Sequence, residues 1–514
     1  MDRRSEPFCL VVNQLREASF PSAASRNEFF SEPQPKQFET FTLEGLRGLR
    51  RMRVPLCLLL AVACGRGPVA ASVSSLQVSP NALNPLSVRV SFDARGADCV
   101  RVVYATDGEP AESTPCVPAE AASSVAVLGL LPGRHYTASV EAWRSGLRGA
   151  TAPLEFDPGP VPDDLLQTQI AISGDPPAGL VLTALNYGSP ARGYAVAFDG
   201  QGRLRLVRPF GTAILETKQQ PHGNLTTFVG STSGWQDVFG EYVEYTPDGN
   251  AVDAWAFTPP SHADDHELLF SYDGLGRVLA AHYFTYDLYP AGNYGVSTAP
   301  RFAVHSLVRQ APGGPPITVY SSAGQVTMDD RIEPPDIATQ PDLDHPNSLE
   351  FDRDGNYLAS WRNLGEITKI DFNTGKVIWR LGGRRNEFTF QNDPLGGFSA
   401  QHSVRVMANG NLLLYDNGWR HDPQETRAAE YQLDVAGRTA TLVWEWRSGI
   451  FTPYTGSVQR LKDGNTLVGL ANAQAVLVDP SGAEIWRSVI TQNGTPLATY
   501  RQLRLASLYD YEAP

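Results

Sequence analysis

The sequence predicts an all-β protein in which a six-bladed β-propeller follows a small β-sandwich of the fibronectin III/Ig-like kind. Short apolar runs alternate with turn residues over most of the chain, and 46 Gly and 39 Pro among 514 residues favour a turn-rich fold. A turn-and-strand unit recurs at a period near 55 residues, which is typical of propellers. Earlier apolar runs have the spacing of sandwich strands.

The repeated unit is a strand, an Asp-Gly or Asn-Gly turn and a second apolar strand. Its clearest copies contain Gly355, Gly410 and Gly464, at steps of 55 and 54 residues. That period is close to the length of a kelch-like blade. The tract from 165 to 505 then holds about six units, so we expect residues 165–514 to form a closed ring of about six blades.

The best-defined unit, from residue 344, has the size of one four-stranded blade. Its third and fourth strands are expected at Glu366 to Phe372 and Lys376 to Leu381. Asp-Gly and Asn-Gly supply the positive φ of a two-residue hairpin turn, so we expect such turns at Asp354-Gly355 and Asn409-Gly410. Tryptophans come near the ends of three units, and we interpret them as inter-blade packing residues: Trp379, Trp446 and Trp486.

The N-terminal region has the pattern of an export signal. Residues 1–51 carry little pattern, and we expect them to be a non-native extension or disordered. Residues 52–71 contain an early arginine, an apolar run and small residues before Cys64, which is typical of a lipoprotein-type signal segment. Lipidation of Cys64 is the preferred interpretation, and plain signal-peptide cleavage is the alternative. Both imply an exported protein, either periplasmic or anchored in the outer membrane.

Residues 72–158 are expected to form the β-sandwich, and 157–164 a Pro- and Asp-rich linker. Cys99 and Cys116 are the cysteines left once the N-terminal segments are set apart. In an oxidising compartment we expect a disulfide between them, with two buried free thiols as the alternative.

Composition and motifs exclude several classes of function. A formal net charge of −13 argues against a nucleic-acid binder. The order of ligands in HADDHE is wrong for a zinc motif, and DRDGN is only a fragment of a calcium loop. A phosphate-binding glycine loop is missing from the sequence. We therefore expect chemistry without a metal or cofactor.

Two histidines stand in short polar loops before strands, His345 in DHPNS and His402 in AQHS. The run from 344 to 418 that contains them, followed by ETRAAEYQLD, resembles the bacterial arylsulfate sulfotransferase (arylsulfotransferase, ASST) family, with its H-x-N-S, W-x-L-G-G, Q-H and F/Y-D-N-G signatures. Weaker likenesses at HADDHELLF and TGSVQRLKDGNTLVG extend the resemblance to 165–505. The family fold is a six-bladed propeller preceded by a small β domain.

The resemblance implies transfer of a sulfuryl group from a phenolic sulfate ester to a phenol, without the nucleotide sulfate donor (PAPS) and through a sulfated histidine. It implies that His402 is the nucleophile and that His345, Arg362 and His266 are further catalytic residues. Asn347 is expected to bind substrate. One departure is that Asn363 stands where the family often has histidine. His262 is an alternative to His266, and either His266 or His345 could be the general acid and base.

The residue chemistry agrees with these roles, because neutral imidazole is nucleophilic near pH 7 and a guanidinium suits an oxyanion. Each residue also has a structural alternative: His402 as a packing histidine, His345 as a loop cap and Arg362 as a solvated strand residue. Asp416-Asn417-Gly418 is interpreted as a strand-ending turn. The other histidines of this region are expected at the surface or in aromatic contacts: His222, His282, His305 and His421.

Two other functions stay open. The protein could be a non-catalytic lipoprotein that binds a ligand or partner, which a large separation of His402 from Arg362 would favour. It could also hydrolyse sulfate esters, which product without an acceptor would favour. The expected partners are a small phenolic sulfate and a phenol, with no nucleic acid and membrane contact only through a lipid anchor. The sequence leaves a homodimer open.

Overall fold

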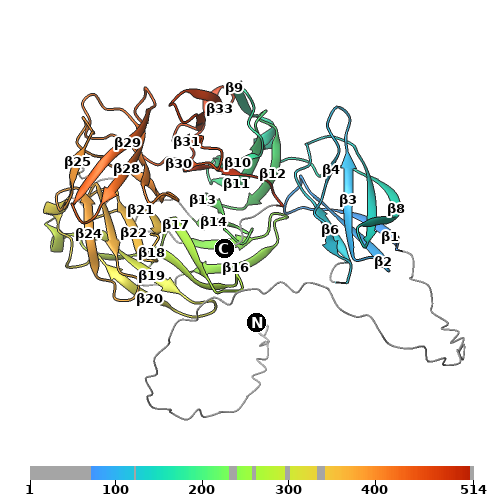
Figure 1. Cartoon of the computed structure of the whole chain (residues 1–514), viewed down its shortest axis with the longest axis horizontal. Coiled ribbons are helices and arrows are strands. Elements are labelled where there is room, and N and C mark those ends of the chain that lie inside the picture. The colour runs from blue at the N-terminus through green and yellow to red at the C-terminus, as the bar shows by residue number, and fades with distance from the viewer. Residues whose placement is uncertain are drawn as a thin grey trace, which may run out of the picture. The chain divides into compact units, whose positions relative to one another are not determined.

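The computed structural model describes residues 71–120, 123–230, 240–256, 262–295, 301–332 and 342–509 (Figure 1). The described residues belong to one compact unit, Arg66–Pro514. The predictions for 1–51, for the signal segment as far as residue 70 and for lipidation of Cys64 fall outside them. Nearly all the regular structure is strand, which confirms the all-β prediction. Helix is limited here to α1 (Asp163–Leu166), η1 (Ala291–Tyr294) and η2 (Met328–Asp330), and no described helix has the length and apolarity to cross a membrane.

The first eight strands make two sheets. One has the order β1 (Ser72–Pro80), β2 (Val88–Arg95), β6 (Ser124–Val127); the other has the order β4 (Glu112–Ser113), β3 (Cys99–Ala105), β7 (Tyr136–Arg144), β8 (Leu147–Phe156), with β5 (Val117–Pro118) also on β3. Alternate residues such as Val90, Val102 and Val140 share one buried core, as period-2 strands require. Cys99 and Cys116 form a disulfide with their Cα atoms 5.6 Å apart, which confirms that prediction.

Six further sheets follow along the chain. The first three, in sheet order, are β12 (Leu204–Phe210), β11 (Arg192–Asp199), β10 (Leu180–Tyr187), β35 (Gln502–Leu505); then β13 (Ile214–Gln219), β14 (Leu225–Gly230), β15 (Gly240–Tyr245), β16 (Ala251–Ala256); then β17 (His262–Tyr272), β18 (Val278–Pro290), β19 (Arg301–Gln310), β20 (Pro316–Ser321).

The last three sheets carry the signature segments. In sheet order they are β21 (Pro346–Phe351), β22 (Tyr357–Trp361), β23 (Glu366–Ile370), β24 (Val377–Gly382); then β25 (Thr389–Gln391), β29 (Thr439–Arg447), β28 (Arg427–Asp434), β27 (Leu412–Asp416), β26 (His402–Val406); then β30 (Ser457–Arg460), β31 (Thr466–Leu470), β32 (Gln474–Val478), β33 (Glu484–Gln492), β34 (Thr495–Pro496), with β9 (Thr168–Gly174) on β33. The predicted four-stranded unit from residue 344 is therefore confirmed.

Strands from both ends of this tract complete its first and last sheets. β35, near the C-terminus, pairs antiparallel with β10, and Leu503 lies opposite Leu182. β9, at the start of the tract, pairs antiparallel with β33, and Figure 1 shows the two strands side by side. The backbone donors and acceptors along these edges are thus satisfied by chain segments more than 300 residues apart in sequence.

The predicted turns lie where the sequence placed them, but they are longer than expected. Phe351 pairs with Tyr357, and Val406 pairs with Leu412, so each loop spans five residues and not two. Only the glycine of each Asp-Gly or Asn-Gly pair has a positive φ, which is 79° at Gly355 and 89° at Gly410. A two-residue type I′ turn needs positive φ at both positions, and this explains the difference.

The three tryptophans pack between sheets, as predicted. Trp379 shares a core with Val404 of the following sheet, and Trp446 shares one with Val458. Trp486 is buried against the first sheet and donates its indole N–H to the carbonyl of Gly200 at 2.9 Å. Each ring therefore joins one sheet to the next.

Candidate active site

The first strands of neighbouring sheets bring the predicted histidines together. His266 lies within β17, His345 immediately precedes β21, and His402 begins β26. β21 lies against both β17 and β26. Each of these strands, or the residue just before it, therefore brings one histidine to a common site, although the three residues span 137 positions of sequence.

His266 and His345 are in direct ring contact, with their centroids 4.7 Å apart and their planes at 75°. His262 lies instead at the start of β17 with its ring 5.2 Å from that of Tyr286. Of the two histidines in HADDH, His266 is therefore the one that meets His345.

Carboxylates give these two histidines different charges. The Nδ1 of His266 lies 2.8 Å from Asp264 and 2.9 Å from Asp265. Burial alone would lower the pKa of His266, but the adjacent carboxylates outweigh it and hold the pKa well above its ordinary value. The Nδ1 of His345 lies 2.5 Å from Asp342, yet burial lowers its pKa below the ordinary value, assisted by the positive charge of His266. At neutral pH, His266 is an imidazolium and His345 is neutral.

His402 is buried and held in one tautomer. Its Nδ1 lies 2.9 Å from the carbonyl of Ala400 and 2.7 Å from Oδ1 of Asn417. Asn417 donates its amide hydrogens to the carbonyls of Thr452 (2.8 Å) and Thr455 (3.1 Å), which orients its Oδ1 toward the ring. Because both partners of Nδ1 are acceptors, Nδ1 carries the proton and the lone pair is on Nε2.

The pKa of His402 lies well below the ordinary value of histidine. Burial is the main cause, and the positive charge of Arg362 is the next. Together they outweigh the hydrogen bond to Asn417, which favours the charged form. His402 is thus neutral at pH 7, with a nucleophilic Nε2 and a cation in electrostatic reach.

Arg362 follows β22 and is buried beside the histidines. Its backbone N–H donates to the carbonyl of His345 at 2.8 Å, and its Nη1 donates to Oδ1 of Asn363 at 2.9 Å. Asn363, which replaces the usual family histidine, also donates to Asp342 at 2.5 Å. It therefore braces the carboxylate that holds His345. The positive charge of Arg362 also lowers the pKa of His402, after burial the next largest cause.

Asn347 joins two of the histidine loops. Its Nδ2 donates to the carbonyl of Gln401 at 2.6 Å, next to His402. Its Oδ1 is buried and has no hydrogen-bond partner within the described ranges. The side chain predicted to bind substrate thus lies between the two loops with one polar atom unpaired.

Three non-glycine residues at the site have left-handed backbone conformations. The φ angles are 52° at His345, 52° at Ala400 and 51° at Ser403. Such conformations cost about 1–3 kcal/mol each and occur preferentially at functional sites. The surrounding sheets must supply this energy and so hold both histidine loops in these conformations.

His305 is a member of the site that sequence reasoning missed. It lies on β19 in contact with the ring of Tyr286, as expected, but the alternative of a surface position is wrong because it is buried. Its Nδ1 lies 2.6 Å from Asp344, and its Nε2 lies 3.6 Å from Asp264. Burial opposes protonation, but Asp344 outweighs it and raises the pKa of His305. Carboxylates and imidazoles therefore alternate along a chain of contacts, in the order Asp344, His305, Asp264 and His266.

The other histidines have structural roles. His222 and His282 make the expected aromatic contacts, with Tyr272 and Tyr357 respectively. The prediction for His421 is wrong, since it is largely covered and lies 2.7 Å from Asp416. Asp416 accepts hydrogen bonds from two backbone N–H groups, which confirms the strand-ending turn.

Tyr500 and Arg501, just before β35, are two further residues that the signatures did not include. Arg501 donates to the backbone carbonyl of Asn347 at 3.0 Å and pairs with Glu216 at 3.1 Å and Glu267 at 2.9 Å. The hydroxyl of Tyr500 lies 3.3 Å from the carbonyls of both His266 and Asn347. The segment that completes the first sheet therefore also supports the site. No local motif marks it in the sequence.

Asp264, Asp265 and His266 have ligand atoms within 4.8 Å of one another and are a group that could hold a metal ion. Here the Nδ1 of His266 already faces both carboxylates as a proton donor. The arrangement is that of an ion-paired imidazolium.

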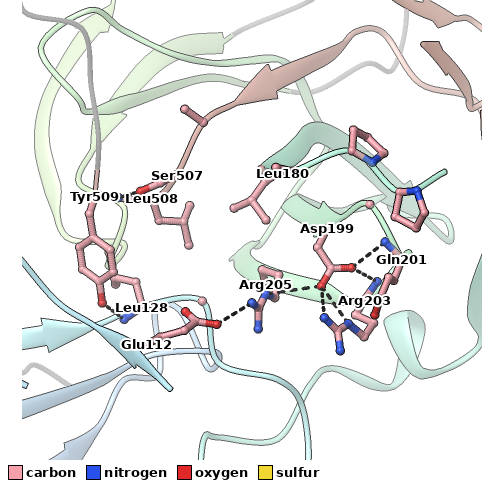
Figure 2. A pocket seen from close by; sticks show the side chains of 17 residues that line it. Glu112, Leu128, Leu180, Asp199, Gln201, Arg203, Arg205, Ser507, Leu508 and Tyr509 are labelled. Atoms are coloured by element: carbon pink, nitrogen blue, oxygen red, sulfur yellow. Dashed lines mark hydrogen bonds and ion pairs between the residues drawn. The ribbon is translucent and has the colours of Figure 1, made fainter. Parts of the chain in front are cut away.

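A separate cavity of about 480 Å³ lies between β4 and the first sheet of the tract (Figure 2). Its arginines are ion-paired, Arg205 with Glu112 at 2.9 Å and Arg203 with Asp199 at 2.9 Å. Of its lining residues, all in the described part of the chain, none is histidine or cysteine.

Fold and site together define an all-β protein of successive, mainly antiparallel sheets, with histidines, carboxylates and an arginine gathered beside the first strands of three of them. The family model of arylsulfotransferases (ASST) matches residues 309–495, which confirms the resemblance to that family over this region. The matched region includes His345, Asn347, Arg362 and His402 but neither His266 nor Arg501.

No curated protein matches the chain. Solved structures show distant likeness. A protein of unknown function from Bacteroides caccae is 11% identical, with 64% of this chain and 100% of that chain covered and a TM-score of 0.40. A protein of unknown function from Bacteroides thetaiotaomicron is 12% identical, with 82% of this chain and 98% of that chain covered and a TM-score of 0.32. Virginiamycin B lyase from Staphylococcus aureus is 9% identical, with 62% of this chain and 88% of that chain covered and a TM-score of 0.31.

Proposed function

We propose that the protein is an aryl-sulfate sulfotransferase independent of PAPS, which moves a sulfuryl group from a phenolic sulfate ester to a phenol through a sulfohistidine at His402. The observation that carries this proposal is the state of His402. Nδ1 is protonated and held by two acceptors, the lone pair is on Nε2, and Arg362 is in electrostatic reach. This residue lies within the region that matches the arylsulfotransferase model.

In the first half-reaction, Nε2 of His402 attacks sulfur and the bond from sulfur to the aryl oxygen breaks. The departing phenolate takes a proton from the imidazolium of His266, which becomes neutral. The sulfated ring keeps its Nδ1 proton and carries positive charge, which the oxygens of Ala400 and Asn417 stabilise. Arg362 stabilises the sulfuryl oxygens, and a fixed donor of this kind commonly contributes a few kcal/mol.

The second half-reaction reverses these steps with a new phenol. Neutral His266 takes the phenolic proton while the phenol oxygen attacks sulfur, and the bond from sulfur to Nε2 breaks. His402 returns to its neutral form and His266 to the imidazolium. Asp264 and Asp265 stabilise the imidazolium of His266, which favours its return to the charged form in this step. We therefore assign the acid and base role to His266.

The architecture proposed for this enzyme is the one expected from the sequence. The six sheets from β9 to β35 would be the blades of a closed six-bladed propeller, residues 165–514, preceded by a fibronectin III/Ig-like sandwich, residues 72–158. The pairings of β35 with β10 and β9 with β33 support closure of the ring. The disulfide supports export to an oxidising compartment, and lipidation of Cys64 remains part of the proposal.

The test is sulfate transfer from 4-nitrophenyl sulfate to phenol by the full chain, compared with His402→Ala. We expect one equivalent of nitrophenol per enzyme, and a peptide containing sulfated His402, when donor is added alone. Further release should require phenol, and the variant should release none. Continued release without phenol, beyond one equivalent, would indicate a hydrolase. Binding of aryl sulfate without release, with every phenol tried, would indicate a binding protein and refute the proposal.

A further inference from the structure

Three aromatic side chains gather beside the site without forming part of a core. Trp419 lies with its ring centroid 5.6 Å from that of Phe451 and 6.0 Å from that of Tyr454. Tyr454 is 42% exposed, and the other two are half-buried. We call these three residues the aromatic cluster. They come from two loops, one after β27 and one after β29.

The loops that carry the aromatic cluster are tied to the nucleophile. Asn417 holds the Nδ1 of His402 and also donates to the carbonyls of Thr452 and Thr455. Trp419 is two residues after Asn417, while the two other rings flank Thr452. The positions of the aromatic rings and the orientation of His402 thus depend on the same side-chain amide, that of Asn417.

Arg362 connects the aromatic cluster to the charged part of the site. Its guanidinium carbon lies 5.0 Å from the ring of Tyr454 and 5.8 Å from that of Trp419. The same cation acts on His402, whose pKa it lowers. A ligand whose anionic group reaches Arg362 therefore has the partly exposed rings of Trp419 and Tyr454 within reach of its uncharged part.

We propose that the aromatic cluster is the aryl subsite of the enzyme and that it binds the ring of the donor and then the ring of the acceptor. This inference rests on the proposed sulfuryl transfer. An aryl sulfate has an anionic end, which matches the cations of the site, and an apolar planar end, which matches the aromatic cluster. Stacked aromatic pairs contribute about 0.5–1.5 kcal/mol beyond burial of area. Trp419 has the largest ring, so it should favour fused-ring phenols over phenol itself.

The experiment measures kcat/KM of the full chain for two acceptors, phenol and 2-naphthol, with 4-nitrophenyl sulfate as donor. For Trp419→Ala and Tyr454→Ala we expect kcat/KM for 2-naphthol to fall about three- to tenfold, with a smaller fall for phenol. Trp419→Phe keeps an aromatic face and should restore most of the difference.

Trp444→Ala is the matched control. Trp444 is also half-buried beneath an arginine, Arg460 at 4.6 Å, but it lies on β29, which pairs with β25 and β28 and not with β26. Its loss should leave the ratio of 2-naphthol to phenol unchanged.

Transfer that persists with an unchanged acceptor ratio in Trp419→Ala and in Tyr454→Ala would overturn the inference. If the wild-type chain transfers sulfate to no phenol, the proposed function fails and calorimetry with 2-naphthyl sulfate decides the aryl subsite. Weaker binding in Trp419→Ala than in the wild type would then support it. Equal binding, or none, would overturn it.

Discussion

Replacing Asn417 with alanine tests the link between the tautomer of His402 and its reactivity. The variant leaves the Nδ1 proton with one acceptor, the carbonyl of Ala400. As the bond from Nε2 to sulfur forms, the ring becomes positive, and a hydrogen bond from a charged donor contributes about 1.5–3 kcal/mol. The rate of the first half-reaction should therefore fall about ten- to a hundredfold. A stopped-flow burst of nitrophenol measures that rate directly.

Asn411→Ala is the matched control for this prediction. Asn411 and Asn417 flank the same strand, β27, and Asn411 also makes a buried hydrogen bond, to Glu430 at 2.7 Å. Both variants should lose about 1–3 kcal/mol of stability, because each leaves a polar partner unsatisfied. Only Asn417→Ala should slow the burst. Equal burst rates in the two variants would show that the hydrogen bond to His402 has no catalytic effect.

Three further predictions concern charge and stability. Asp264→Asn should lower the pKa of His266, so its imidazolium loses the proton at a lower pH. The falling limb of the pH profile of kcat should therefore move toward acid pH. A limb that does not move would assign the general acid to another group. Arg501→Met leaves the buried carboxylates of Glu216 and Glu267 with less compensating positive charge. The free energy of unfolding, measured in urea, should fall by about 3–5 kcal/mol. A change below about 1 kcal/mol would indicate that the ion pairs of Arg501 are redundant. The double variant Cys99→Ser and Cys116→Ser removes the disulfide, which joins residues separated by 17 positions in sequence. The free energy of unfolding should fall by about 3 kcal/mol, and an unchanged urea midpoint would contradict this.

The expectations based on local sequence agree best with the structure. Alternating apolar runs and glycine turns set strand positions, because side-chain direction and positive φ are properties of a few consecutive residues. The four strands from residue 344 are an example. Turn length was wrong at Asp354-Gly355, since the register of the two strands decides it and the turn residues alone do not.

The sequence alone determined the all-β class, the disulfide partners and the two loops that present His345 and His402. Only the tertiary structure decided which groups act on them. His305 and Arg501 reach the site from strands that no shared motif connects, and Asn417 belongs to a different signature from His402. The contacts of all three residues exist only once the strands and sheets pack. The charges of the histidines depend on the same packing, because burial and carboxylates brought in from other segments set each pKa.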